Sequence, residues 1–491
     1  MRKPLIMTAL AVALGLAGCA QVPTPTAPPQ LDLPTLAATV DIAQAKQLER
    51  WWSAFVDPTL DKLVDEALAN NLDVRAAIAR IESARAQVKL VSRDQYPSLD
   101  LNVGASRNRA TEAGSFAQPG VPLYSNDFRV ALQASYETDF WGKFHGATRA
   151  AQVDLVATQY AREIVRTVVA ADVARLYFSL VAADAQRALL EDTLKTRVRS
   201  IELQNERRKA GIIGDYELGT AQAERDSVVA DIAGVRQAIA ESESALSVLL
   251  GRSPREVFNA QVARSVATDW ASTVPAIPAG LPSDLLARRP DVRQSEAQLA
   301  AASVRIDVAR AAYYPSISLT GALGNQAASL RDLVSAPALI WSVGASLVQP
   351  LFGIRAIEAN VEVQTAVRNE RVVAYTKTVQ AAFRDTHDAL SANETSRTAL
   401  AAQSARREKL AAVLELSDLR YRSGYSPFLE VLDAQRQLLL AQTLQITAAR
   451  NVRLAVVDLA KALGGGWDAA ALAEPAEVAR AAAGRPASAR P

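Results

Sequence analysis

An internal repeat covers most of this sequence, and it restricts the possible folds more than any other feature. Two stretches recur at a spacing of 218 positions: Leu72-Asp73-Val74-Arg75 with Pro290-Asp291-Val292-Arg293, and Tyr96-Pro97-Ser98 with Tyr314-Pro315-Ser316. Four more recur at a spacing of 213 positions: Gly211 with Gly424, Glu217 with Glu430, Ala221-Gln222 with Ala434-Gln435, and Leu250-Gly251 with Leu463-Gly464. Such self-similarity indicates two copies of one structural unit. We place them at about 60–255 and 282–466, joined by a linker over 256–281, although a length of 491 residues alone suggests roughly three domains.

Each copy has the same order of predicted elements: a helix, two strands and a pair of very long helices. Between Phe144 and Lys209 there is no proline and one glycine, and apolar residues recur every three or four positions, which is typical of a long helix. At roughly 1.5 Å per residue this helix is about 100 Å long, so it must pack on its hairpin partner and on other subunits. We expect strands at about 97–106, 127–141, 315–324 and 339–351, and helical hairpins at about 143–250 and 356–463.

The four predicted strands alternate apolar and polar side chains, as strands with two unlike faces do. Leu99, Leu101 and Val103, for example, alternate with Asp100 and Asn102. Their length suits tilted transmembrane strands, although a soluble antiparallel sheet with one solvated face alternates in the same way. Four strands cannot close a barrel, and strand edges cannot stay unpaired in lipid, so a membrane location requires an oligomer. Two copies would supply eight strands and three would supply twelve, and the sequence does not choose between them.

The N-terminal residues read as a processing signal. Two basic residues precede an apolar run over 5–16 that is too short for a retained membrane helix. Leu16-Ala17-Gly18-Cys19 then resembles the lipobox of bacterial lipoproteins, which implies a signal peptide over 1–18, lipidation of Cys19 and a tether over 19–59. Ala20 in the next position implies sorting to the outer membrane of a Gram-negative envelope. An ordinary signal peptide with an incidental cysteine is the alternative.

Composition excludes several classes of function. The 54 Lys and Arg nearly balance the 52 Asp and Glu, for a net charge of +2, so nothing favours nucleic acid as a partner. One Cys and two His are too few for a disulfide framework or a His/Cys metal cluster. There is no phosphate-binding loop and no nucleophile elbow. We therefore predict no enzyme activity, no cofactor and no metal, and we expect a disordered Ala/Pro/Arg-rich tail over 467–491.

Longer motifs identify a family. The matching stretches are Trp51-Trp52-Ser53-Ala54-Phe55, Leu281-Pro282-Ser283-Asp284-Leu285-Leu286-Ala287-Arg288-Arg289-Pro290-Asp291-Val292-Arg293, Tyr314-Pro315-Ser316-Ile317-Ser318-Leu319-Thr320-Gly321, and Lys461-Ala462-Leu463-Gly464-Gly465-Gly466-Trp467. With these, the sequence resembles the outer-membrane efflux proteins of the TolC and OprM type, most closely the NodT subfamily of lipoprotein channels. The resemblance covers nearly the whole mature chain and both repeats.

The resemblance implies a mainly α fold with a transmembrane β-barrel part. Three copies would form one 12-stranded β-barrel and a long periplasmic α-helical barrel, held in the cell outer membrane and anchored through Cys19. It implies a passive exit duct for drugs or other toxic small molecules, coupled through a periplasmic adaptor to a proton-driven inner-membrane pump. Two alternatives are the duct of a type I protein-secretion system and a non-conducting coiled-coil lipoprotein of the envelope.

The turns between the long helices are where a duct could close. Glu430 and Asp433 lie three residues apart and share one helix face, so three copies would make an acidic ring if that face lines the pore. By resemblance, Tyr421 and Glu217 belong to the contacts that hold neighbouring hairpins shut. The alternative for the two acidic residues is a pair of solvated helix charges.

The same turns are the expected contacts for the adaptor. The residues concerned are Gly211, Gly214, Asp215, Gly424 and Pro427. Their small-residue composition is equally what any tight turn requires.

Overall fold

The computed structural model describes residues 49–111, 122–264, 274–275 and 288–467. The predicted signal peptide, Cys19 and most of the tether lie outside the described residues. So do most of the expected linker and all of the expected tail beyond Trp467.

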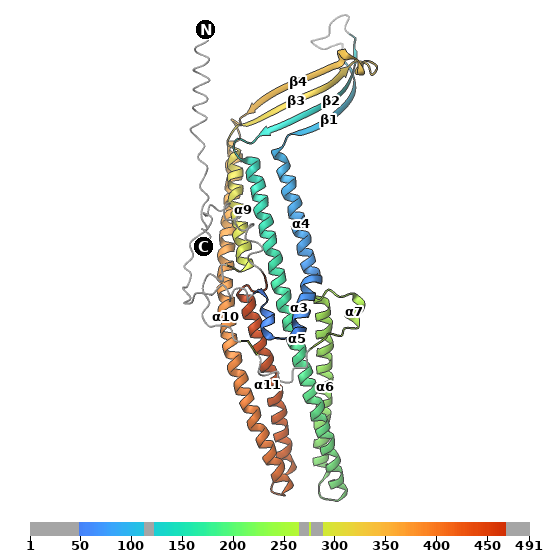
Figure 1. The fold of residues 1–491 in the computed structure, drawn as a ribbon, viewed down its shortest axis with the longest axis vertical. Helices are drawn as coiled ribbons and strands as arrows, with labels where there is room; N and C mark the ends of the chain where they lie inside the picture. Colours follow the sequence, from blue (N-terminus) through green and yellow to red (C-terminus); the bar gives the residue numbers. More distant parts are fainter. Residues whose placement is uncertain (1–48, 112–121, 265–273, 276–287, 468–491) are drawn as a thin grey trace.

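Long helices run side by side away from a four-stranded sheet at one end of the molecule (Figure 1). The first half contains η1 (Trp51–Phe55), α3 (Pro58–Asn70), α4 (Leu72–Ser92), η2 (Arg93–Gln95), β1 (Ser98–Arg109), β2 (Tyr124–Thr138), α5 (Lys143–Lys209), α6 (Asp215–Leu249) and α7 (Pro254–Phe258). The second contains α9 (Pro290–Ala311), β3 (Ser316–Ala327), η3 (Asp332–Val334), η4 (Ala336–Ala338), β4 (Leu339–Val348), α10 (Ile354–Arg422) and α11 (Phe428–Ala462). No helix in the described ranges combines the length and apolar character needed to cross a membrane.

The two halves of the chain repeat one another element by element. Strand β3 begins and ends 218 positions after β1, and α11 begins and ends 213 positions after α6. The longest helices, α5 and α10, have 67 and 69 residues, which corresponds to about 100 Å each. The repeat that defines the sequence therefore defines the fold.

The sheet is antiparallel, in the order β1-β2-β3-β4, and its register gathers the apolar side chains on one face. Leu101 pairs with Leu132, Leu132 with Leu323 and Leu323 with Trp341, so one apolar row crosses all four strands. Directly paired residues point to the same face of a sheet. Many large side chains of this face are exposed, among them Leu132 at 44%, Trp341 at 73% and Val343 at 83%, so apolar surroundings must cover it.

The strand ends differ slightly from the sequence prediction. Strand β1 extends to Arg109, because its last residues continue to pair with β2. Strand β4 ends at Val348 rather than 351, since Pro350 has no N–H to donate to a ladder.

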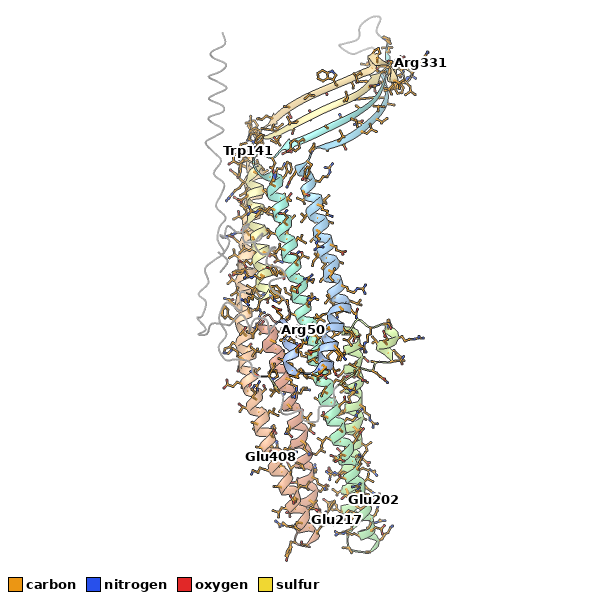
Figure 2. All side chains as sticks on the ribbon, in the orientation of Figure 1. Arg50, Trp141, Glu202, Glu217, Arg331 and Glu408 are labelled. Atoms are coloured by element: carbon orange, nitrogen blue, oxygen red, sulfur yellow. The ribbon has the colours of Figure 1, made fainter. Side chains whose placement is uncertain are left out.

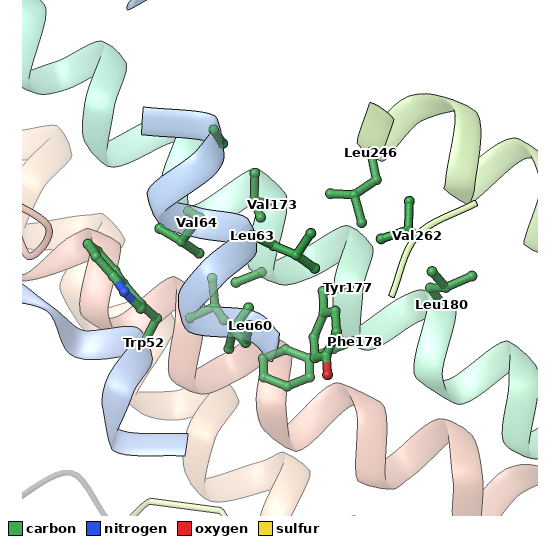
Figure 3. Packing of buried hydrophobic residues seen from close by; sticks show 14 of the residues in the cluster. Trp52, Leu60, Leu63, Val64, Val173, Tyr177, Phe178, Leu180, Leu246 and Val262 are labelled. Carbon is green, nitrogen blue, oxygen red and sulfur yellow. The ribbon is translucent and has the colours of Figure 1, made fainter. Parts of the chain in front are cut away.

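The main hydrophobic core lies midway along the helices, where α3 packs on α5 (Figure 3). Trp52 and Leu60 are buried in this cluster together with Tyr177 and Phe178 of α5, and the ring centroids of Phe55 and Phe178 are 4.7 Å apart. The hydroxyl of Tyr177 donates a hydrogen bond to Oδ2 of Asp57, at 2.5 Å, and Asp57 also caps α3. The tryptophan-rich motif that precedes the first repeat is thus a packing element that fixes the N-terminal segment to the long helices.

Candidate functional site

The two turns between the long helices lie together at the end of the molecule farthest from the sheet, where Figure 2 labels Glu217. Gly211 and Gly424 occupy equivalent positions with φ of +71° and +78°. After each glycine, the next amide donates back to a carbonyl five residues earlier: Ile212 to Arg207 and Tyr425 to Arg420, both at 2.9 Å. These are Schellman ends, which require a left-handed residue that glycine adopts without strain. We call the region from 197 to 224 and from 417 to 436 the tip.

Tyr421 connects the two helical hairpins at the tip. Its hydroxyl accepts hydrogen bonds from Nε2 of Gln204, at 3.2 Å, and from the guanidinium of Arg207, both on α5. The same guanidinium lies over the Tyr421 ring, with its central carbon 4.8 Å from the ring centroid, an attractive arrangement for a cation. The ring also packs on Phe428 of α11, with centroids 5.6 Å apart. One tyrosine therefore joins α5 to both α10 and α11.

A small apolar cluster surrounds this contact. Ile201 of α5 and Leu218 of α6 are buried against Phe428 and Leu432 of α11. The tip is thus held by one apolar cluster and by the hydrogen bonds of Tyr421 beside it.

Within the tip, a buried polar layer lies one helical turn beyond Ile201, on the side away from the turns. Arg197 of α5 is only 3% exposed; it donates to Oε1 of Gln435 on α11 and approaches Glu224 of α6 at 3.9 Å. Glu224 also lies 3.4 Å from Nε of Arg436 on α11. Burial lowers the pKa of Arg197, and Arg436 lowers it further while Glu224 opposes, but an arginine still remains charged at neutral pH. The layer is a second polar connection between the hairpins.

The two acidic residues predicted at the gate differ in their surroundings. Glu430 is half-buried, with Oε1 3.6 Å from the guanidinium of Arg420 on α10. Asp433 is exposed on the side of α11 opposite the buried Val431 and Leu432. Among the described residues its side chain has no ion-pair partner. Within one protomer, therefore, the negative charge of Glu430 is partly balanced by Arg420, whereas that of Asp433 is not balanced by a neighbouring cation of the described residues.

Glu217 caps its own helix in the protomer. Its carboxylate accepts a hydrogen bond from the backbone N–H of Gly214, at 3.2 Å. The described part of the chain contains no hydrogen bond or ion pair from Glu217 to the second hairpin. Asp215 is exposed and pairs with Arg208, at 2.8 Å, which closes the α5–α6 turn. The role of Glu217 between neighbouring hairpins stays a prediction.

Large apolar side chains are exposed at equivalent places on the two turns. Ile212 and Tyr425, 213 positions apart, are 69% and 82% exposed, and Tyr216 and Leu429, at the same spacing, are 73% and 53% exposed. Both hairpins therefore present the same kind of surface at the end of the molecule.

The sequence prediction missed most polar partners of the tip. Gln204, Arg207, Arg197 and Glu224 were not singled out, although Arg197 and Gln204 lie seven residues apart on the stripe that includes buried Ile201. A polar residue that occupies a core position of a helical repeat is the signal that could have indicated them.

Several known outer-membrane proteins are similar to this chain over nearly its whole length. The family model described as outer membrane efflux protein matches residues 63–252 and 281–465. Outer membrane protein OprJ of Pseudomonas aeruginosa is 34% identical over 484 residues, which covers 95% of this chain and 97% of OprJ. The solvent efflux pump outer membrane protein SrpC of Pseudomonas putida is 33% identical over 474 residues, covering 95% and 98%. The cation efflux system protein CusC of Escherichia coli is 31% identical over 472 residues, covering 95% and 99%.

Solved channels share the whole fold. The CmeC outer membrane channel of Campylobacter jejuni superposes with a TM-score of 0.82 at 26% identity, covering 92% of this chain and 98% of CmeC. CusC gives 0.81 at 29% identity, covering 91% of this chain and all of CusC. The MtrE channel of Neisseria gonorrhoeae, solved in an open state, gives 0.76 at 28% identity, covering 92% and 99%.

Proposed function

The chain belongs to the outer membrane efflux protein family, and we propose that three copies of it form a passive exit duct coupled to an adaptor and a pump. As an outer-membrane efflux channel, it carries out transport and no covalent chemistry. The observation that carries this function is the four-stranded sheet, whose continuous apolar face is attached to helices of about 100 Å. A sheet of this kind suits the bilayer, and the helices reach far across the periplasm.

A homotrimer is the assembly that we propose. Within the described residues, β1 and β4 are the unpaired edges of the sheet, and in lipid each edge must pair with a strand of another copy. Three copies would supply twelve strands, an even number within the range of outer-membrane barrels. Exposed aliphatic side chains along the helices, such as Val413, Leu416 and Leu419 of α10, supply apolar surface for neighbouring copies.

The gate is proposed at the tip, where α11 presents Asp433 and Glu430. In a threefold ring these carboxylates would lower the potential at the entrance and favour cations. The contact of Tyr421 with Arg207 and Gln204 supports a closed position of the second hairpin, because moving it away from α5 breaks both hydrogen bonds.

The adaptor is proposed to bind the two turns. Gly211, Gly214, Asp215, Gly424 and Pro427 shape the turns, and the exposed Ile212 and Tyr425 at equivalent positions supply apolar contacts. A partner made of repeated subunits could bind both turns in the same way. The inner-membrane pump that this adaptor serves is proposed to be proton-driven.

Small toxic molecules are the proposed cargo. Relatives are named for efflux of solvents, toluene, antibiotics and cations, and a passive duct need not select among them, because selection can reside in the pump. Cys19, outside the described residues, is proposed to carry the lipid anchor. Cys19→Ser should abolish incorporation of labelled palmitate, whereas a protein with an ordinary signal peptide would never incorporate it.

Conductance of the purified protein in a planar lipid bilayer tests the duct and its gate. We expect discrete single channels, and Glu430→Gln combined with Asp433→Asn should raise conductance and reduce cation selectivity. Asp215→Asn is the matched control, because it removes an exposed carboxylate of the other turn. A protein that never conducts, even with the gate variant, would instead be a scaffold; unchanged conductance and selectivity would contradict the acidic ring alone.

A further inference from the structure

The apolar face of the sheet carries two charged residues along its four strands, and both are arginines. Arg107 and Arg109 occupy the last alternating positions of the face that begins with Leu99 in β1. The opposite face carries charges of both signs along its length: Asp100, Asp127, Arg129 and Glu137. The two arginines therefore form a local cluster of positive charge on an otherwise uncharged face.

Both guanidinium groups lie against the same aromatic ring. The central carbon of Arg107 is 5.4 Å from the ring centroid of Tyr124, and that of Arg109 is 5.8 Å away. Tyr124 is the register partner of Arg109 and is 57% exposed. Two residues along a strand place the arginine backbones roughly 6.6 Å apart. The ring holds two like charges close together, an arrangement that an anion between them would stabilise.

The depth of the arginines matches the rim of the apolar band. The chain from Leu99 to Arg109 advances ten residues, which at roughly 3.3 Å each and a strand tilt of about 40° spans about 25 Å along the membrane normal. The apolar band of outer-membrane strands is also about 25 Å tall. Because the helices leave the sheet from the opposite end of β1 (Figure 1), this rim lies at the outer leaflet if the helical part is periplasmic.

We propose that Arg107, Arg109 and Tyr124 bind the phosphate groups of a phosphorylated lipid of the outer leaflet. This inference rests on the proposed function, because it needs the sheet to span the outer membrane. Arginine binds phosphate through two parallel N–H groups, and the leucine and valine side chains below it on the same face can contact acyl chains. A ligand with both features fits the surface better than a free phosphate does. Lipid A, with two phosphates on an acylated sugar, has this chemistry.

Native mass spectrometry of the full-length purified protein tests the site, with bis-phosphorylated lipid A and dephosphorylated lipid A as the two probes. We expect Arg107→Gln combined with Arg109→Gln to weaken binding of the phosphorylated probe by about tenfold or more. Dephosphorylated lipid should bind the wild type as weakly as the phosphorylated lipid binds this double variant. Arg331→Gln is the control, because Arg331 lies at the same end of the sheet but in the β3–β4 connection (Figure 2). The affinity of this variant for the phosphorylated probe should stay within about twofold of the wild type, since no aromatic ring of the described residues lies over the Arg331 guanidinium.

Three results would overturn the site. They are equal affinity of the double variant and the wild type, equal affinity of the two probes for the wild type, and complete displacement of lipid A by inorganic phosphate. Conductance of the same samples separates this failure from failure of the proposed function. A double variant that conducts normally is folded and inserted, so its lipid affinity tests the site alone. Absence of conductance in the wild type would contradict the proposed function and, with it, the location of the site at the outer leaflet.

Discussion

Tyr421→Phe should loosen the tip without disturbing its packing. The substitution removes one oxygen atom and keeps the ring, which remains in contact with Phe428 and with the Arg207 guanidinium. It removes the acceptor of two hydrogen bonds, one from Gln204 and one from charged Arg207. Gln204 is fully buried, and its Oε1 atom already has no partner in the described part of the chain. Its Nε2 group would then be unpaired as well.

The expected cost is about 2 kcal/mol per protomer. A neutral hydrogen bond contributes about 1 kcal/mol and one to a charged group about 1.5–3 kcal/mol, but Arg207 is half-exposed and water replaces the lost acceptor, which reduces its share to about 1 kcal/mol. A change of about 2 kcal/mol raises the ratio of open to closed hairpins by roughly 30-fold. If the three hairpins open independently, each closed channel spends correspondingly more time partly open.

Single-channel recording in planar bilayers measures this change. We expect Tyr421→Phe to shorten closed intervals and raise mean conductance, and Tyr425→Phe to leave both unchanged, because Tyr425 is 82% exposed on the adjoining turn. Arg207→Met should act in the same direction, and its effect combined with that of Tyr421→Phe should fall short of the sum, because the hydrogen bond between Arg207 and Tyr421 can be lost only once. Two results would refute a closing role for the Tyr421 contact. One is a Tyr421→Phe channel whose closed intervals equal those of the wild type, and the other is full additivity of the two substitutions.

Two further substitutions test the local physics of the tip by thermal unfolding. Gly424→Ala should lower the free energy of unfolding by about 1 kcal/mol, because φ is +78° there although no atom crowds the site. Gly219→Ala inside α6, in equally open space, should raise it by about as much, and changes of the same sign would contradict this reasoning. Glu224→Gln should lower the free energy of unfolding by about 3 kcal/mol, because buried Arg197 then loses its counter-charge. Arg197→Met should lower it less, because Glu224 keeps its ion pair with Arg436; the reverse order would show that the buried arginine needs no counter-charge.

Sequence periodicity predicted those features that depend on neighbouring residues. The alternation of Leu99, Leu101 and Val103 with polar residues needs no knowledge of the rest of the fold, and the register of the sheet confirms that these residues share one face. Likewise, a proline-free run with apolar residues every three or four positions predicts a helix from local spacing alone, and α5 covers the predicted run.

Contacts between the two hairpins could not be predicted in this way. Arg197 and Gln435 are 238 positions apart, and the local pattern around Arg197 does not distinguish a buried arginine from one that reaches solvent at the edge of a stripe. Only the packing of α11 on α5 determines that Arg197 is buried. The pairing of Glu430 with Arg420 likewise depends on how tightly the turn brings α10 and α11 together.

The two halves are joined very differently at the two ends of the molecule, and this difference limits where the duct can open. At the sheet, β2 and β3 pair continuously from Thr138–Ile317 to Phe128–Ala327, and they approach so closely that a Cβ atom on Gly324 would lie 2.2 Å from the carbonyl oxygen of Val130. Separating the halves there would break a whole ladder, and in lipid the freed groups would have no water to bond to. At the tip, the small apolar cluster, the Tyr421 contact and the polar layer hold the hairpins, and water can replace each polar partner. We therefore predict that, if the tip is the gate, opening bends the helices between the buried core around Tyr177 and the tip and leaves the sheet unchanged.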